Sequence, residues 1–269
     1  MSTLDTLDLA IAPSFKDELV GMLREYSDNR PRSRQTRIGP SEIGHPCDRR
    51  MAMRLAGVEG IKSGGDPLPS TIGSWAHAGM EEMLTGYNER HGERFLIEQK
   101  VYPLHPAPAY GGTMDCYDLR NDAVIDWKFA GAAKMTAVRR DSHPGEVYRI
   151  QSHIYGLGSE RTLGLSPKTV HVVFWPRAGF STGAVDWSEP YDRDLAIRAI
   201  ERLDSLLIMA DDLKVEQHPD RFSVFPIEPL QCEYCPFFSP SPTSPTECGG
   251  PPAAQIRKFD GTVIRPTTE

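Results

Sequence analysis

The sequence lacks any long hydrophobic run. Its 269 residues have a mean hydropathy of -0.42, and no stretch approaches the roughly 18 consecutive apolar residues of a membrane-spanning helix. This composition excludes an integral membrane protein. The N-terminal segment also lacks a basic cluster and carries Asp5 and Asp8, which is not typical of a secretory signal peptide. We therefore expect a cytoplasmic protein.

A nucleotide-binding motif and internal repeats are also absent. The nearest approach to a phosphate-binding loop is residues 57–65, GVEGIKSGG, but Ile61 separates the glycine and lysine that a Walker motif needs side by side. We therefore expect that the protein does not use ATP and is free-standing rather than part of a nucleotide-driven motor. The length suits one large domain or two small ones, and we predict a single domain over residues 1–269.

Cysteine is scarce, with five residues in the chain. A reducing compartment argues against a disulfide framework and leaves free thiols, redox chemistry or a metal. Cys232 and Cys235 form a C-x-x-C motif, Cys248 follows, and Cys47 lies far upstream. Four thiolates can bind zinc tetrahedrally or hold an iron–sulfur cluster, and unpaired buried thiols are the third alternative. Cys116 is adjacent to Asp115 in a predicted strand, so we expect it to be a small core residue.

Negative charge dominates the chain, which has a formal net charge of -7. Taken alone, that balance speaks against a nucleic-acid-binding protein. The charge is uneven, however: seven arginines and two acids between Arg30 and Arg54 give this segment a local charge of +5 (7 − 2). A second basic segment runs from Lys128 to Arg149. Such segments can steer a polyanion, although arginines that simply solvate a surface are the plain alternative.

Hydrophobic periodicity predicts a sheet with helices before and after it. The predicted helices are Phe15–Tyr26, Ile72–His91, a helix from Pro144 to about Leu157, and Asp192–Leu213; the predicted strands are Phe95–Tyr102, Gly112–Leu119, Ala123–Phe129 and Thr169–Trp175. Asn121 and Asp122 form a turn that joins the second and third strands in a hairpin. Lys62–Pro69 and Ser239–Pro252 are predicted loops. This order indicates an α/β or α+β fold.

The predicted hairpin carries two acids and a lysine. Asp126 and Lys128 share one face of their strand, and Ile125, Trp127 and Phe129 share the other, which we expect to face the core. Asp115, on the partner strand, can bring a second carboxylate to the same place. Converging carboxylates favour Mg²⁺ or Mn²⁺, and a nearby lysine can position a water molecule and offset charge on a phosphate. The combination suits hydrolysis of a phosphodiester bond.

The acid-x-lysine spacing alone is weak evidence. It occurs at Glu98, Asp126 and Asp212, whereas about one occurrence is expected by chance in a chain of this composition. Only the occurrence at Asp126 lies in a strand preceded by G-x-x-D, from Gly112 to Asp115. A surface hairpin with solvated charges is the alternative interpretation.

Two further pairs have helical spacing. His77 and Glu81 lie four residues apart in one predicted helix, and Gln151 and Tyr155 lie four apart in another; either pair alone is more typical of packing. The ordered set G-x-x-x-H, G-x-x-D, D-x-K and Q-x-x-x-Y, however, resembles the RecB-type branch of the PD-(D/E)XK nuclease superfamily.

The resemblance implies specific roles and a fold. His77, Asp115 and Asp126 would bind the metal ion, and Lys128 would assist the attacking water. Gln151 and Tyr155, the other members of the catalytic set, would contact the site or the DNA. The implied fold is a restriction-endonuclease-like core, a central mixed sheet flanked by helices, within residues 70–215.

The cysteine pattern is similar to that of the CRISPR-associated RecB-like exonucleases and the AddB nuclease domain. By that resemblance, Cys47, Cys232, Cys235 and Cys248 would hold a [4Fe-4S] cluster, with zinc as the alternative, although the loop before Cys248 is longer than in the family. The cluster would join residues 30–60 to residues 228–252. We expect Arg49 and Arg50, next to Cys47, to guide DNA phosphates. Trp75 and Tyr148 could stack on bases, but core packing is the expectation for both.

The resulting expectation is a metal-dependent DNA exonuclease. By resemblance we expect it to act on free ends of single-stranded DNA, in phage or prokaryotic recombination, repair or processing. Two alternatives from other classes stay open: a non-catalytic, zinc-stabilised DNA-binding module, and a recombination accessory protein that needs a partner. A homo-oligomer also stays open.

Overall fold

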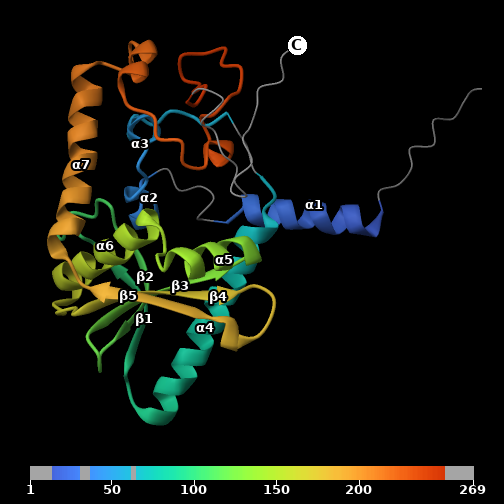
Figure 1. Ribbon diagram of the computed structural model, residues 1–269, viewed down its shortest axis with the longest axis vertical. Helices are drawn as coiled ribbons and strands as arrows, with labels where there is room; N and C mark the ends of the chain where they lie inside the picture. Colours follow the sequence, from blue (N-terminus) through green and yellow to red (C-terminus); the bar gives the residue numbers. More distant parts are fainter. Residues whose placement is uncertain (1–13, 31–36, 62–64, 252–269) are drawn as a thin grey trace, which may run out of the picture.

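The computed structural model describes residues 14–30, 37–61 and 65–251 (Figure 1). Parts of several predicted features lie outside the described residues: Arg32 and Arg34 of the first basic segment, Lys62 of a predicted loop, Pro252 at the end of the second cysteine segment, and both ends of the predicted domain.

A five-stranded mixed sheet forms the centre of the fold. Its order is β1-β2-β3-β4-β5, and every pair is antiparallel except β3 with β4. The strands are β1 (Phe95–Val101), β2 (Gly112–Asp118), β3 (Ala123–Ala130), β4 (Thr169–Pro176) and β5 (Val185–Pro190). Because parallel neighbours need a long crossover, the chain passes through two helices between β3 and β4.

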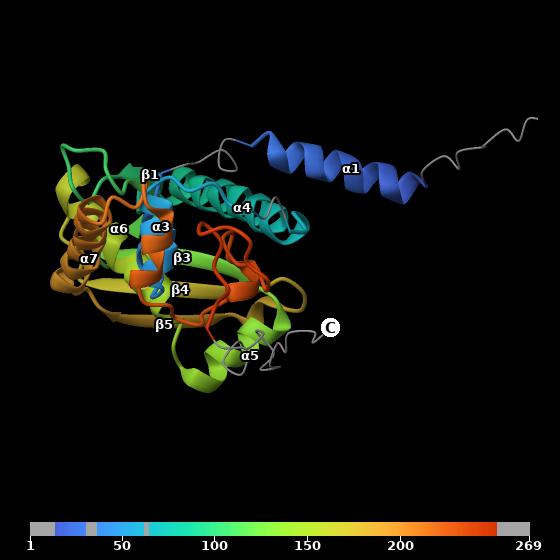
Figure 2. The same cartoon turned by 90° about the horizontal axis from the view of Figure 1, so that it is seen from above.

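All helices of the described chain except α1 pack on the sheet or on other parts of the fold (Figures 1 and 2). They are α1 (Phe15–Asp28), α2 (Pro40–Ile43), α3 (Asp48–Leu55), α4 (Leu68–His91), α5 (Ala132–Asp141), α6 (Glu146–Leu163) and α7 (Arg193–Asp212). Helix α6 lies against β1, β3 and β4, α4 lies against β1 and β3, and α7 packs on α6. In Figure 2, α1 projects away from this body, and no residue of α1 is buried.

Most predicted elements are confirmed with shifted ends. Helix α4 begins at Leu68 because the predicted loop before Ile72 supplies a proline-containing first turn, and α6 continues to Leu163, where Gly164 ends it in the left-handed region at φ 66°. Asp192 accepts a hydrogen bond from the Leu195 N–H, so it caps α7 rather than belonging to it. Strand β5 and helices α2, α3 and α5 were not predicted; β5 is a half-exposed edge strand without a strong apolar pattern.

The predicted orientation of β3 is only partly correct. Trp127 faces away from Asp126 and is buried, but Ile125 and Phe129 are only half-buried. Asp126, expected opposite the core, is 0% exposed because α6 covers its face of the sheet. Strands with a parallel neighbour in a helix-covered sheet are buried on both faces, and alternation along one strand does not reveal which face is deeper.

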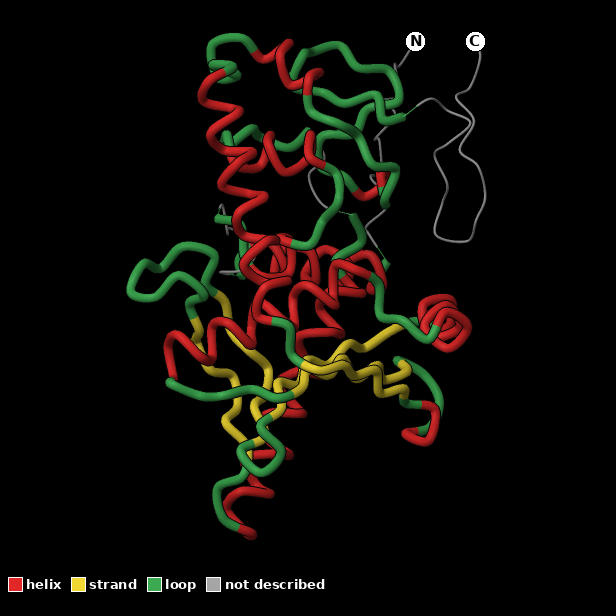
Figure 3. The backbone as a smooth tube through the Cα atoms, turned by 60° about the vertical axis from the view of Figure 1, so that its left-hand side comes forward, coloured by secondary structure: helices red, strands yellow, loops and turns green. Residues whose placement is uncertain are grey.

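The cysteine-bearing C-terminal loops form a second packed region of the fold. Figure 3 shows these C-terminal loops beside α7, on the far side of α6 from most of the sheet. The two predicted cysteine segments meet there, because Cys47 lines one cavity with Cys232, Cys235 and Cys248. Main-chain hydrogen bonds that reach just beyond the predicted bounds join the same regions: the Arg49 N–H donates to the Pro226 carbonyl, and the Ile61 N–H donates to the Pro236 carbonyl. Within the described part of the chain, no helix has the length and apolar character needed to cross a membrane.

Close packing of α6 on β1 depends on Gly158. A Cβ atom at Gly158 would lie 2.8 Å from Val101 Cγ2, whereas one at Gly79, in α4, would meet nothing within 4 Å. Gly158→Ala should therefore lower the free energy of unfolding by about 1–3 kcal/mol, and Gly79→Ala should raise it by up to about 1 kcal/mol. Urea unfolding of both variants measures the difference; equal effects would contradict this packing.

Candidate functional site

The hairpin of β2 and β3 opens at its acidic residues. Ladder pairing runs from Asp118 with Ala123 to Cys116 with Ile125 and stops there, although both strands continue. Beyond that point the Trp127 N–H donates to Asp115 Oδ2 at 3.0 Å. The side chain of Asp115 thus takes the place of a main-chain acceptor, which fixes one of its carboxylate oxygens between the strands.

Three side chains around this opening form a group that could hold a metal ion. His77 Nδ1 lies 3.5 Å from Asp115 Oδ1 and 3.9 Å from Glu98 Oε1. One ligand atom from each of His77, Glu98 and Asp115 lies within 4.8 Å of the others. An imidazole with two carboxylates is a donor set that suits Mn²⁺ and tolerates Mg²⁺.

Glu98 is the residue of this group that the sequence did not single out. It belongs to an acid-x-lysine match that looked like chance, and its position depends on an irregularity of β1. Its φ is 49°, in the left-handed region, and the pairing of β1 with β2 omits the Glu98–Asp115 position. A non-glycine residue in that conformation is uncommon and is found disproportionately at functional sites.

Asp126 and Lys128 form a buried ion pair beside this group. Lys128 Nζ lies 2.5 Å from Asp126 Oδ2, and the Gln151 amide donates to Asp126 Oδ1 at 3.1 Å. The same amide nitrogen lies 3.3 Å from the hydroxyl of Tyr155. Lys128 also lies over the ring of Tyr148, 5.2 Å from its centroid. The structure therefore brings the predicted residues together, with Asp126 bound to Lys128 rather than grouped with His77.

Burial and like charge shift the protonation of these groups. Burial, reinforced by Asp126, raises the pKa of Asp115 to about 7. Burial alone would lower the pKa of His77, but Glu98 and Asp115 outweigh it and raise this pKa. In the same way, Asp126 and Asp115 overcome the effect of burial and raise the pKa of Lys128. Lys128 is therefore a firmly charged ammonium group, while Asp115 holds a proton readily in the absence of a metal ion.

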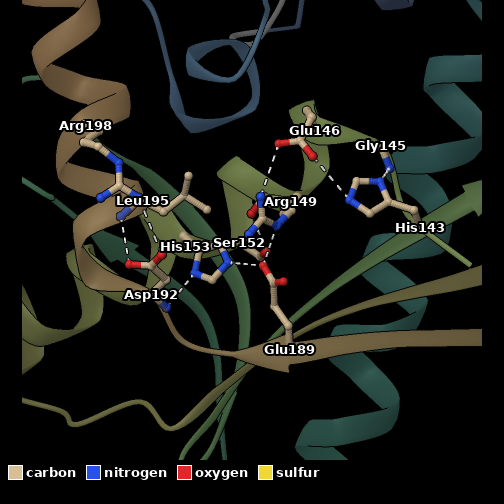
Figure 4. A network of polar contacts seen from close by, with 10 residues as sticks. All are labelled: His143, Gly145, Glu146, Arg149, Ser152, His153, Glu189, Asp192, Leu195 and Arg198. Atoms are coloured by element: carbon tan, nitrogen blue, oxygen red, sulfur yellow. Dashed lines mark hydrogen bonds and ion pairs between the residues drawn. The ribbon is translucent and has the colours of Figure 1, made fainter.

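The other side of α6 is anchored by a polar network (Figure 4). The Asp192 N–H donates to His153 Nδ1 at 3.0 Å, so the ring proton is on Nε2, which donates to Glu189 Oε1 at 2.6 Å. Arg149 Nε donates to the same oxygen at 2.6 Å. Positions 149 and 153 lie roughly opposite positions 151 and 155 on a helix. The network thus fixes the rotation of α6 that turns Gln151 toward Asp126.

Four other residues that the sequence analysis named can be compared with their positions in the structure. Tyr148 packs edge-on against Phe174, as core packing predicts. Trp75 is 55% exposed, so the expectation of core packing is wrong for it. Glu81 is also exposed and is not part of the group with His77. Cys116 is fully buried, as expected, and burial raises its pKa to about 12.

The four remaining cysteines line one cavity. Cys47, Cys232 and Cys248 are buried and Cys235 is half-buried; all four are free thiols. Burial raises the pKa of Cys232 to about 11, and the neighbouring cysteines add to that shift. Thiols in such surroundings become thiolates only when a cation compensates their charge.

Arg49 and Arg50 line the same cavity. Arg49 donates to the carbonyls of Phe225 and Ser223, and its Nη1 lies 4.0 Å from Cys248 Sγ. The predicted role of both arginines in guiding DNA stays a prediction.

Comparison with solved structures gives distant matches. They include an alkaline exonuclease from Laribacter hongkongensis (12% identity, 72% of this chain and 96% of that chain, TM-score 0.47), the protein SSO0001 (18%, 84% and 96%, 0.44), and a phage-related exonuclease from Haemophilus somnus 129PT (13%, 67% and 96%, 0.45). The sequence matches no protein-family model, and no curated protein matches it significantly. At these scores the matches carry no argument about function, which must come from the site.

The raised pKa of Asp115 predicts pH-dependent metal binding. Below about pH 7, Asp115 must lose a proton before it binds a cation, and His77 must do the same. Mn²⁺ affinity, measured by titration calorimetry on the metal-free protein, should therefore fall roughly tenfold or more from pH 8 to pH 6. Asp115→Asn should bind weakly with a smaller pH dependence. An affinity that is constant from pH 6 to pH 8 would contradict this assignment.

Proposed function

We propose that this chain is a divalent-metal-dependent deoxyribonuclease that hydrolyses phosphodiester bonds from free DNA ends. One observation carries the proposal: the potential metal-binding group of His77, Glu98 and Asp115 lies close enough to the Lys128 ammonium, which buried Asp126 holds, for Lys128 to lower the pKa values of His77 and Asp115 and for Asp115 to raise that of Lys128. An ion pair that only stabilises the fold does not require metal-ligating side chains next to it. A metal-dependent hydrolytic site requires both the metal ligands and the lysine.

His77, Glu98 and Asp115 would hold the metal ion. When bound, a divalent cation would supply electrostatic stabilisation of the charge that develops on a phosphate. The histidine and Glu98 side chains are 29% and 30% exposed, so the group is open to a substrate on one side. Asp115 is oriented by the Trp127 N–H, which leaves its Oδ1 facing His77.

Lys128 would act on the attacking water and on the phosphate. Its side chain is 20% exposed, and its ammonium has three donors, of which Asp126 occupies one direction. The remaining donors can orient a water molecule and stabilise negative charge on a phosphate oxygen. Gln151 holds Asp126 in place, and Asp126 holds Lys128; we assign these two residues a positioning role, with Tyr155 supporting the Gln151 amide.

The DNA specificity of the proposal rests on the ordered motifs. Trp75 is exposed on α4, but it lies two residues before His77 and therefore on nearly the opposite side of the helix, so we assign it no role in the site. By the resemblance of the motifs, single-stranded DNA or DNA with free ends is the proposed substrate. Recombination, repair or DNA processing in a phage or prokaryote is the corresponding role.

A cysteine-bound metal centre completes the proposal. The cavity residues fit such a group because four free cysteines line the cavity and the Arg50 Nε–H is buried with no hydrogen-bond partner among the described residues. Four cysteines around one cavity can bind a single zinc ion or a [4Fe-4S] cluster, in which each cysteine binds a different iron. We propose the cluster, with zinc as the alternative. A resemblance to the CRISPR-associated exonucleases is consistent with this assignment.

Substitutions at the ion pair test the nuclease proposal. Asp126→Asn/Lys128→Met removes both charges while keeping the shape of the pair, so it should fold and lose at least about 100-fold in Mn²⁺-dependent digestion of an end-labelled single strand. Lys128→Ala alone should also lower stability, because it leaves Asp126 charged and buried without its partner. Thermal melting separates the two effects.

The matched control is Lys214→Ala. Lys214 belongs to the third acid-x-lysine match, is exposed, and lies beyond the end of α7. It should digest the strand at the normal rate. If the double variant digests DNA as fast as Lys214→Ala, the site is wrong and a non-catalytic DNA-binding module becomes the better account.

Removal of one cysteine tests the metal centre. Protein purified without oxygen should be brown and contain iron and acid-labile sulfide, and Cys232→Ala should lose both together with much of its folding yield, because a structural metal centre stabilises by roughly 10 kcal/mol. Cys116→Ala is the control, since Cys116 lies in the sheet. Iron content that is unchanged in Cys232→Ala would disprove the centre. Stoichiometric zinc in the purified protein would identify the centre as a zinc site and not as an iron–sulfur cluster.

A further inference from the structure

Two arginines at the cysteine cavity have no acidic partner among the described residues. Arg54, on the same helix, forms an ion pair with Glu42 at 3.2 Å. Asp48, the acidic residue that precedes Arg49 in the sequence, forms an ion pair with Arg202 at 2.5 Å. Arg49 and Arg50 are only partly exposed, and a poorly solvated positive charge needs a nearby negative charge.

Arg49 is held in a fixed position with one nitrogen directed at sulfur. Its Nε donates to the Phe225 carbonyl at 3.2 Å and its Nη2 to the Ser223 carbonyl at 2.7 Å. These two bonds fix the guanidinium plane, and the remaining Nη1 lies 4.0 Å from Cys248 Sγ. The Gly250 N–H approaches the same sulfur at 3.4 Å. Cys248 therefore has two N–H donors in place before any metal is bound.

Arg50 supplies a second charge from the adjacent position. It lines the cavity with the cysteines, and its buried Nε–H lacks a hydrogen-bond acceptor in the described part of the chain. Four thiolates with either a [4Fe-4S] core or a zinc ion carry a net charge of about -2. Two guanidinium groups balance that charge.

We infer that Arg49 and Arg50 are charge-compensating hydrogen-bond donors to the metal–thiolate centre, and that they control how firmly the centre is retained and, for an iron–sulfur cluster, its reduction potential. The inference rests on the cysteine centre of the proposed function. It gives these arginines a different task from contact with DNA phosphates, because the guanidinium of Arg49 is already engaged by two carbonyls and a sulfur.

The direction of the effect follows from charge. Positive charge and N–H donors at the sulfurs stabilise the more negative, reduced state of a cluster and therefore raise its reduction potential. They also lower the cost of keeping four thiolates together in a buried cavity. Loss of either arginine should speed metal loss and shift the potential downward, whereas Arg49→Lys keeps the charge and should retain part of the potential.

The test uses the full chain purified without oxygen. Arg49→Met and Arg50→Met should lose metal to a chelator at least about 10-fold faster than the unaltered protein, and an EPR-monitored redox titration should give lower potentials. Arg50→Met guards against a folding artefact, because its Nε makes no hydrogen bond on which the described fold could depend. Arg54→Met is the matched control on the same helix, and it should behave as the unaltered protein does.

Three results separate the possible failures. Arginine variants that retain metal and potential as Arg54→Met does would overturn the inference while leaving the cysteine centre intact. If the same variants also bind single-stranded DNA more weakly, with the salt dependence reduced by about one ion per arginine, the DNA-guiding role is correct instead. An unaltered protein without any bound metal would refute the cysteine centre of the proposed function, and the inference with it.

Discussion

The concentration of negative charge at the opening of the β2–β3 hairpin is the constraint on which the site depends. Asp115 and Asp126 are both buried, and burial, reinforced by the nearby Asp126, raises the pKa of Asp115. Lys128 supplies one positive charge through its ion pair with Asp126. A divalent ion among His77, Glu98 and Asp115 would supply the rest.

The scaffold maintains this arrangement from both sides of the sheet. Helix α6 carries Gln151 to Asp126, and the contacts of His153 and Arg149 with Glu189 prevent the helix from rotating. Helix α4 carries His77 over the rings of Trp127 and Phe129, with centroids 6.4 and 6.2 Å from that of the histidine. The chemistry is thus positioned by helices that themselves pack on the strands bearing Asp115, Asp126 and Lys128.

Features with local causes could be predicted from the sequence. The hairpin follows from alternation and a two-residue turn, and the pairing of Asp126 with Lys128 follows from their shared face. Glu98 could not be predicted, because its place beside His77 depends on a left-handed residue within β1. The burial of Asp126 was missed for a similar reason, since it is caused by α6 and not by the strand. Strand β5 was missed because its alternating exposure leaves little apolar pattern.

The cysteines illustrate the same limit at longer range. Four cysteines at separated positions indicated a shared site, and they line one cavity. The surroundings of Arg49 were beyond prediction, since its acceptors are the main-chain carbonyls of residues more than 170 positions away, at separations of 174 and 176. Main-chain acceptors carry no signature in the sequence, so for a basic residue close to a predicted ligand the sequence alone favours a contact with DNA.

The most direct measurement of the central claim is anomalous diffraction from a crystal soaked in Mn²⁺. The account predicts an anomalous peak at about 2.0–2.3 Å from a His77 nitrogen and from carboxylate oxygens of Glu98 and Asp115, with the Lys128 ammonium directed toward the same space. No peak between these three residues at a Mn²⁺ concentration that supports DNA digestion would contradict the account.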